Sequence, residues 1–321
     1  MIREIGSEFH RMPPEKGPGL PLPRAGSLVF SGRTALAAVL SRLPKARTAL
    51  LPSYCCESMI VPFRDAGIRV RFYDVNWQDG MRVDLKGTAD VLLWCNYFGY
   101  RMDMPAFDGP VIEDITHSLL SLRPCHGGSD YLVASLRKWE PLLCGGYCSV
   151  QTEGEEPPEA FLALKAAAMD LKAAYLLDGD EGKKPAFLEM FAQSNRFLGE
   201  RCSGLAMDHW SREYLAHVDA AAQRRIRRQN ARVLYEGLGG RVPFLFPEAD
   251  MDCPLFVPIL LDHRDRVRQR LIESRIYCPV HWPRPEGCAS DIYDRELSLI
   301  CDQRYGVDDM ERIVSVLSQA I

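Results

Sequence analysis

The sequence has no apolar run of membrane-spanning length, little net charge and no Cys-x-x-Cys pair. A membrane helix needs about 18 consecutive apolar residues, and no stretch of this chain reaches that length. The formal net charge is −4, from 39 basic and 43 acidic residues, so no overall field would attract a nucleic acid. We therefore expect neither a membrane nor a nucleic acid as a partner.

The 11 cysteines are odd in number and scattered along the chain. Cys144 and Cys148 flank a Gly-Gly turn, but nothing nearby completes the four ligands of a zinc site, and we expect no metal. The first ten residues, which include Glu4 and Glu8, lack the pattern of a secretion signal. Scattered thiols without a signal predict a cytoplasmic protein with reduced cysteines.

The length of 321 residues is enough for two domains. Residues 11–24 hold five prolines and two glycines, so residues 1–24 are predicted to form an irregular arm. We place a large domain at residues 25–205. A long helix and a small α+β domain are expected at residues 206–321.

Continuous apolar runs of strand length dominate the large domain. They are Thr48–Leu51, Val91–Cys95, Val111–Ile112 and Tyr131–Ala134. Strands of a parallel sheet that is buried on both faces have this composition. Because helical segments alternate with these runs, the sequence predicts a doubly wound α/β domain with a mostly parallel sheet.

The second half of the chain is more helical. We expect helices between Glu155 and Gly199 with a break at 179–185, and one long amphipathic helix over Asp208–Leu238. The dense basic run Arg224–Arg228 is interpreted as a solvated face of that helix. Strands are expected at Phe256–Leu260 and from Ile276, and helices at 264–274 and 308–319.

Lys138 has the most informative setting in the chain. It stands three residues after Ser135, at the end of a strand-like run, and Gly145-Gly146 follow it. Upstream, Asp114 ends the run that begins at Val111. A strand-end aspartate, Ser-x-x-Lys and Gly-Gly is the layout of a pyridoxal 5'-phosphate (PLP) site. In such a site the lysine forms a Schiff base with the cofactor aldehyde, the aspartate pairs with the pyridinium nitrogen, and the serine binds phosphate.

Each of these residues also has a structural interpretation. Lys138 could be a surface lysine beside Arg137 and Glu140, and Asp114 could cap a helix that begins near Thr116. The seven other lysines lie in polar or helical contexts. The spacing between Asp114 and Lys138 favours the functional interpretation of both.

Two further needs of the cofactor have candidates. The segment Ser31-Gly32-Arg33-Thr34 precedes a helix, so Gly32, Arg33 and Thr34 are expected to bind phosphate, Arg33 through its backbone N–H. Tyr54 and His117 are candidates for packing on the ring face. Either of the two could instead be an ordinary core residue.

In this order, the pieces resemble the DegT/DnrJ/EryC1/StrS aminotransferases of fold type I, over most of the chain. The resembling segments are Gly32–Leu36, Leu51–Val75, Asn96–Gly99, Ile112–Asp114 with His117, Ser135–Lys138, Gly145–Gly146 and Val280–Pro283. The resemblance implies a fold type I PLP-dependent transferase. It also implies a homodimer with an amino donor, expected to be glutamate, and a keto-sugar nucleotide or related keto or aldehyde metabolite as the small-molecule acceptor.

Several departures from the family pattern leave alternatives open. A family segment whose asparagine reaches the phosphate of the partner subunit has no clear counterpart, and Asn195 is the nearest stand-in. The same cofactor could serve a non-transaminating dehydratase or lyase, although the sugar dehydratases of this family carry histidine where Lys138 stands. A catalytically silent, PLP-binding regulatory protein is the third hypothesis. Intact Lys138 and Asp114 favour the aminotransferase.

Overall fold

The computed structural model describes residues 3–122, 128–200 and 203–321. Within them, the largest sheet has eight strands in the order β2-β9-β8-β7-β6-β3-β4-β5. The strands are β2 Ser27–Val29, β3 Thr48–Pro52, β4 Arg69–Trp77, β5 Met81–Asp84, β6 Val91–Cys95, β7 Val111–Asp114, β8 Tyr131–Ser135 and β9 Gly146–Cys148. The five strands from β8 to β4 run parallel, and β9 and β5 are antiparallel to their neighbours. The predicted mostly parallel α/β sheet is therefore confirmed.

The central strands form where the sequence has its continuous apolar runs. Every residue of β6 and β7 is buried, including the polar Glu113 and Asp114 at the end of β7. Helices α1 (Gly32–Leu40) and α2 (Glu57–Asp65) belong to the same domain. The sequence analysis missed β5 and β9. The Gly-Gly segment that it read as a turn enters β9, which lies between β8 and β2.

Two helices replace the single long helix predicted over 208–238. Helix α5 covers His209–Leu215 and α6 covers Ala220–Leu238. Asp208 and Asp219 each cap one of them, because their side chains accept hydrogen bonds from the backbone N–H groups of Ser211 and Ala222. The prediction was wrong because no glycine or proline marks the break.

The basic run on α6 is also not the solvated face that we predicted. Arg227 is fully buried, lies 4.4 Å from the ring centre of Trp139, and donates hydrogen bonds to the carbonyls of Pro254 and Leu255. Arg228 donates to two backbone carbonyls as well. These arginines join α6 to the loop before β10, and Arg225 stays exposed.

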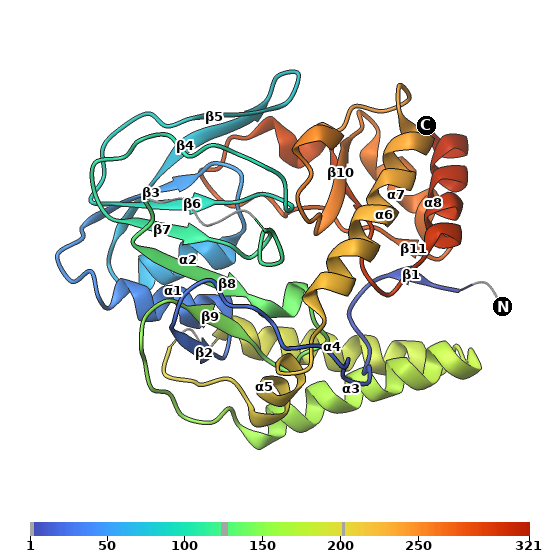
Figure 1. Ribbon diagram of the computed structural model, residues 1–321, viewed down its shortest axis with the longest axis horizontal. Helices are drawn as coiled ribbons and strands as arrows, with labels where there is room; N and C mark the ends of the chain where they lie inside the picture. The colour runs from blue at the N-terminus through green and yellow to red at the C-terminus, as the bar shows by residue number, and fades with distance from the viewer. Residues whose placement is uncertain (1–2, 123–127, 201–202) are drawn as a thin grey trace.

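The C-terminal part contains short strand pairs and the last helices. Strand β10 (Phe256–Leu260) pairs antiparallel with β12 (Glu296–Ile300), and β11 (Ile276–Tyr277) pairs parallel with β1 (Ile5–Gly6). The remaining helices are α3 Glu159–Asp178, α4 Lys183–Glu200, α7 Arg264–Glu273 and α8 Val307–Ala320, with 3-10 turns η1 Leu136–Lys138, η2 Glu248–Asp250 and η3 Asp291–Asp294. Figure 1 shows the large sheet on the left, this C-terminal part on the right, and the α3–α4 hairpin below.

The predicted irregular arm contains a short strand near its start, because Ile5 and Gly6 pair with β11 in a two-stranded sheet.

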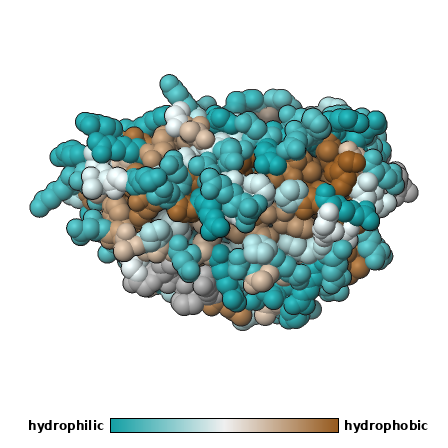
Figure 2. Space-filling view, turned by 90° about the horizontal axis from the view of Figure 1, so that it is seen from above, coloured by the Kyte–Doolittle hydropathy of each residue, from teal (hydrophilic) through white to brown (hydrophobic). Residues whose placement is uncertain are grey.

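Hydrophilic side chains cover most of the face in Figure 2, with apolar ones showing in patches between them. No helix within the described ranges is both long enough and apolar enough to cross a membrane.

Gly146 allows β9 to lie against the start of α1. A Cβ at this position would be 2.3 Å from the carbonyl oxygen of Ser31 and 2.9 Å from the backbone nitrogen of Gly32. Only glycine permits this approach, because both contacts are to backbone atoms. At Gly145 an added Cβ would meet side-chain atoms instead, those of Leu142 and Met207 at 3.0 Å and the Cβ of Leu136 at 3.5 Å.

We predict that Gly146→Ala lowers the free energy of unfolding by about 3 kcal/mol, the upper range for overpacking, because Ser31 and Gly32 must move. Gly145→Ala is the matched control and should cost less, since the ends of flexible side chains can shift. Urea denaturation of both variants measures the difference. An equal cost for the two glycines would contradict the backbone argument.

Glu140 is a buried acid two residues after Lys138. It is 1% exposed, and neither carboxylate oxygen accepts a hydrogen bond from another described residue. Burial raises the pKa of this carboxyl from 4.5 to about 8. The folded state therefore holds a proton that the unfolded state releases between pH 4.5 and 8. Stability should fall as the pH rises through that interval.

We predict that Glu140→Gln raises the free energy of unfolding at pH 8 by roughly 4 kcal/mol and changes it little near pH 4.5, because glutamine does not ionise. Urea denaturation at several pH values tests this. Glu213→Gln, at an exposed position on α5, is the control. A gain from Glu140→Gln that does not depend on pH would show that titration is not the cause.

Candidate active site

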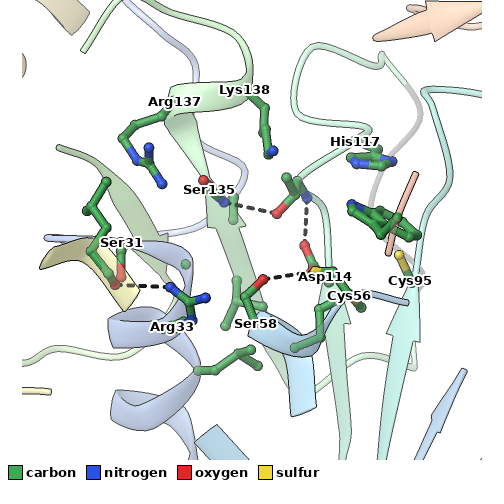
Figure 3. Close-up of a pocket in the computed structure, with 18 of the residues that line it drawn as sticks. Ser31, Arg33, Cys56, Ser58, Cys95, Asp114, His117, Ser135, Arg137 and Lys138 are labelled. Atoms are coloured by element: carbon green, nitrogen blue, oxygen red, sulfur yellow. Dashed lines mark hydrogen bonds between the residues drawn. The ribbon is translucent and has the colours of Figure 1, made fainter. Parts of the chain in front are cut away.

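A cavity of about 380 Å³ lies where β7 and β8 end and α1 begins (Figure 3). Six of the eight residues predicted for the site line it, namely Gly32, Arg33, Asp114, His117, Ser135 and Lys138. Thr34 and Tyr54 do not line it. The cavity forms here because β7 and β8 are neighbouring parallel strands, so their carboxyl ends reach the same edge of the sheet.

Lys138 is positioned by the turn that follows β8. The 3-10 turn η1 carries it out of the strand end, and Figure 3 shows its side chain reaching into the cavity. Thr116 fixes this segment from the neighbouring strand end. Its Oγ1 accepts a hydrogen bond from the backbone N–H of Ser135 at 2.9 Å, and its carbonyl accepts one from the indole of Trp139 at 2.6 Å. The sequence analysis gave Thr116 no such role.

The surroundings of Lys138 favour its neutral amine. The side chain has free surface because it faces an open cavity, yet protein surrounds that cavity. Burial, with the adjacent guanidinium of Arg137 as a second cause, lowers the pKa of this amine. A neutral amine is the form that attacks an aldehyde, so the position suits a nucleophilic lysine.

Asp114 is 7% exposed at the end of β7. Its Oδ1 accepts a hydrogen bond from the backbone N–H of Thr116 at 2.8 Å. Burial raises the pKa of this carboxyl, and none of the ion pairs among described residues includes it. A cation placed in the cavity beside Asp114 would offset the cost of its charge. The residue therefore fits a protonated ring nitrogen.

The aromatic wall of the cavity contains His117 and Trp282. Their rings are nearly parallel, with centroids 5.7 Å apart and an angle of 26°. The Nδ1 of His117 accepts a hydrogen bond from the backbone N–H of Phe98, and burial holds the pKa of the imidazole well below 6.5, so the ring is neutral. The ring centroid of Tyr54 lies 5.1 Å from that of Trp282, and Tyr54 does not line the cavity. Of the two ring-face candidates, only His117 lines the cavity.

The other end of the cavity is formed by the first turn of α1. Ser31 caps this helix, because its Oγ accepts a hydrogen bond from the backbone N–H of Thr34. The Thr34 hydroxyl lies 3.0 Å from the same oxygen and takes part in the cap. Gly32, Ser58 and Ser135 line this end, which offers hydroxyl groups and a helix N-terminus to an anion.

Among the cavity-lining residues that the sequence analysis did not assign to the site, three have charged or amide side chains. They are Glu8 of the N-terminal arm, Arg137 of η1 and Asn195 of α4, although Asn195 was noted as a stand-in for a family asparagine. Asn195 donates a hydrogen bond to the Glu8 carboxylate at 3.2 Å. No local pattern marks Glu8, because only the folded chain brings it to the cavity.

The two cysteines beside the Gly-Gly segment have separate structural contacts. The thiol of Cys144 donates to the carboxylate of Asp208, the cap of α5, and Cys148 faces backbone carbonyls. Among the described residues, no three His, Cys, Asp or Glu side chains are placed to hold a metal ion together.

No protein-family model and no curated protein sequence matches the chain. Solved structures do match. The sugar aminotransferase CalS13 from Micromonospora echinospora superposes with a TM-score of 0.64 and 14% identity, covering 92% of this chain and 87% of that one. The aminotransferase TlmJ from Streptoalloteichus hindustanus gives 0.63 and 16%, covering 92% and 85%. Spr1654 from Streptococcus pneumoniae, in its PLP form, gives 0.63 and 12%, covering 92% and 88%. The chain therefore has the fold of these aminotransferase structures.

Proposed function

We propose that this protein is a PLP-dependent aminotransferase related to the DegT/DnrJ/EryC1/StrS family. It would move an amino group from an amino acid, with glutamate as the expected donor, to a keto-sugar nucleotide or a related keto or aldehyde metabolite. One observation carries the proposal: Lys138 and Asp114 share one cavity at the carboxyl edge of neighbouring parallel strands. The similarity to aminotransferase structures, among them Spr1654 in PLP and PMP forms, supports it.

The cavity residues fit this cofactor. PLP supplies an aldehyde for an amine and a protonated ring that withdraws electrons from the bond being broken. Lys138 offers the amine, with a pKa already lowered by its surroundings. Asp114 offers a buried carboxylate without an ion pair among the described residues, which would keep the ring nitrogen protonated.

Lys138 would also carry the proton during transfer. Once its amine is free, it remains tethered by η1 at the edge of the cavity, between Asp114 and the first turn of α1. A neutral amine can accept a proton and return it at a neighbouring atom, and the lowered pKa of Lys138 favours that form. The flat, neutral His117 would pack on the cofactor ring.

The structural matches support the proposed acceptor. One matching structure was solved with its TDP-sugar product and covers 92% of this chain at a TM-score of 0.63. We also propose a homodimer, because the resembling enzymes act as dimers.

A non-transaminating PLP enzyme and a silent cofactor-binding protein are less well supported. The dehydratases of the resembling family replace the lysine by histidine, whereas this chain has Lys138 in the cavity. A silent protein would have no need for the buried carboxyl of Asp114 and a lysine of lowered pKa in one cavity.

We predict that PLP makes the purified protein yellow and that borohydride fixes the cofactor on Lys138, since its amine lines the cavity. Peptide mapping by mass spectrometry locates the adduct. Lys172 is the alternative site of reaction to exclude, because burial lowers the pKa of its amine to about 7. An adduct on Lys172, or none after cofactor loading, would remove the central assignment.

We predict that Asp114→Asn slows the half-reaction with an amino donor by at least about a hundredfold, because a neutral amide no longer favours the protonated ring nitrogen. Stopped-flow absorbance measures the rate. Asp65→Asn, at the exposed end of α2, is the control and should react normally. A near-normal rate for Asp114→Asn in a folded protein would leave this residue only a turn-capping role.

A further inference from the structure

Arg137 lines the cavity next to Lys138 and forms no ion pair with any described residue. Its Nε is buried without a hydrogen-bond partner, and within the described residues the side chain makes no hydrogen bond or ion pair. A guanidinium presents five N–H donors and keeps its charge at any physiological pH. An unpaired charge in this position destabilises the free protein, and the described part of the chain supplies no anion to pair with it.

Arg33 provides a second guanidinium at the same end of the cavity. One of its terminal nitrogens donates to the carbonyl of Leu198 at 3.0 Å, while its Nε is buried and has no partner. In Figure 3 both arginines project toward the side where Ser31 and Ser135 lie, and Asp114 and His117 lie on the opposite side. The two guanidinium groups therefore surround the end that α1 opens to anions.

The charges around this end are unbalanced. Glu8 is the carboxylate that lines it, and it is already held by Asn195 and by Lys165, whose Nζ is 3.8 Å from Glu8. Despite burial, these partners and the nearby Arg137 lower the pKa of Glu8 to about 2, so it stays charged. One carboxylate shared with Lys165 leaves Arg33 and Arg137 free for an anion of higher charge, and a phosphate monoester carries about −1.5 to −2 near neutral pH.

We propose that Arg137, together with Arg33, binds the phosphate group of the cofactor through its guanidinium, so that side chains of a single chain complete the phosphate site. A planar guanidinium can bind phosphate oxygens with two parallel hydrogen bonds. Arg33 thereby acts through its side chain as well as through the helix backbone. Gly32 keeps the entrance open, since a Cβ there would approach the Cβ of Ser135 to 3.3 Å.

The inference rests on the proposed cofactor but makes a separate claim. Arg137 could instead hold a carboxylate of the substrate, or it could act only by lowering the pKa of Lys138. These roles predict different effects of an Arg137 substitution on the binding of a cofactor that lacks the phosphate. Pyridoxal offers the same aldehyde and ring as PLP and lacks the phosphate, so comparing the two ligands isolates the phosphate contact.

The test measures the dissociation constants of PLP and pyridoxal by absorbance titration. We expect Arg137→Ala to weaken PLP binding at least about tenfold, as for other charged hydrogen bonds, and to change pyridoxal binding less than about twofold. Arg137→Gln, which is closer in shape, should behave the same way. Arg196→Ala is the control, because Arg196 lies on α4 in an exposed ion pair with Glu189 and should bind both ligands normally.

A second readout needs no cofactor chemistry. Inorganic phosphate should raise the melting temperature of the unloaded wild-type protein and of Arg196→Ala, and should raise that of Arg137→Ala much less. Circular dichroism before loading checks that each variant is folded.

Each other outcome overturns the inference in a distinguishable way. Equal weakening of PLP and pyridoxal would show that Arg137 acts through Lys138. Normal PLP binding with a raised KM for the amino donor would assign Arg137 to the substrate. If the wild-type protein bound neither PLP nor pyridoxal, the proposed function itself would fail, and this result would be visible before any variant was made.

Discussion

The register between β7 and β8 is the constraint on which the site depends. Asp114 lies directly opposite Val133, so the strand end that carries the carboxylate is level with the strand that leads, two residues later, to Ser135. From there one 3-10 turn is enough to bring Lys138 to the same cavity. A shift of one residue would turn the Asp114 side chain to the other face of the sheet and separate it from Lys138. Thr116 secures this register by binding both segments.

Several charged or ionisable groups in the site reduce the stability of the protein when no ligand is bound. Arg137 has no partner within the described residues, Asp114 is a buried carboxyl with a raised pKa, and Lys138 is an amine with a lowered one. Each costs stability unless a ligand offers the opposite charge. Rules of polar pairing that hold in the rest of a fold are often broken at functional sites. Here the residues that break these rules all line one cavity, and their charges complement a ligand with an anionic end and a cationic ring.

Local sequence predicted the features that local chemistry determines. The buried strands could be found from apolar runs such as Val91–Cys95, and Lys138 with Asp114 from their place at strand ends. Features set by tertiary contacts could not. The break between α5 and α6 has only Asp219 as a signal, β9 is short and begins with glycine, and Glu8 reaches the cavity through contacts with distant helices. His117 lines the cavity and Tyr54 does not, and this difference depends on tertiary packing, which no spacing reveals.

The pairing of β1 with β11 has a consequence for how the chain folds. Ile5 pairs with Ile276, about 270 residues later. At a synthesis rate of about 5–20 residues per second, the first strand waits roughly 15–55 seconds on the ribosome before its partner is made. During that time the large sheet, whose strands all lie within residues 27–148, can form without it. Strand β1 is thus among the last elements to be placed, and Glu8, two residues after it, is placed with it.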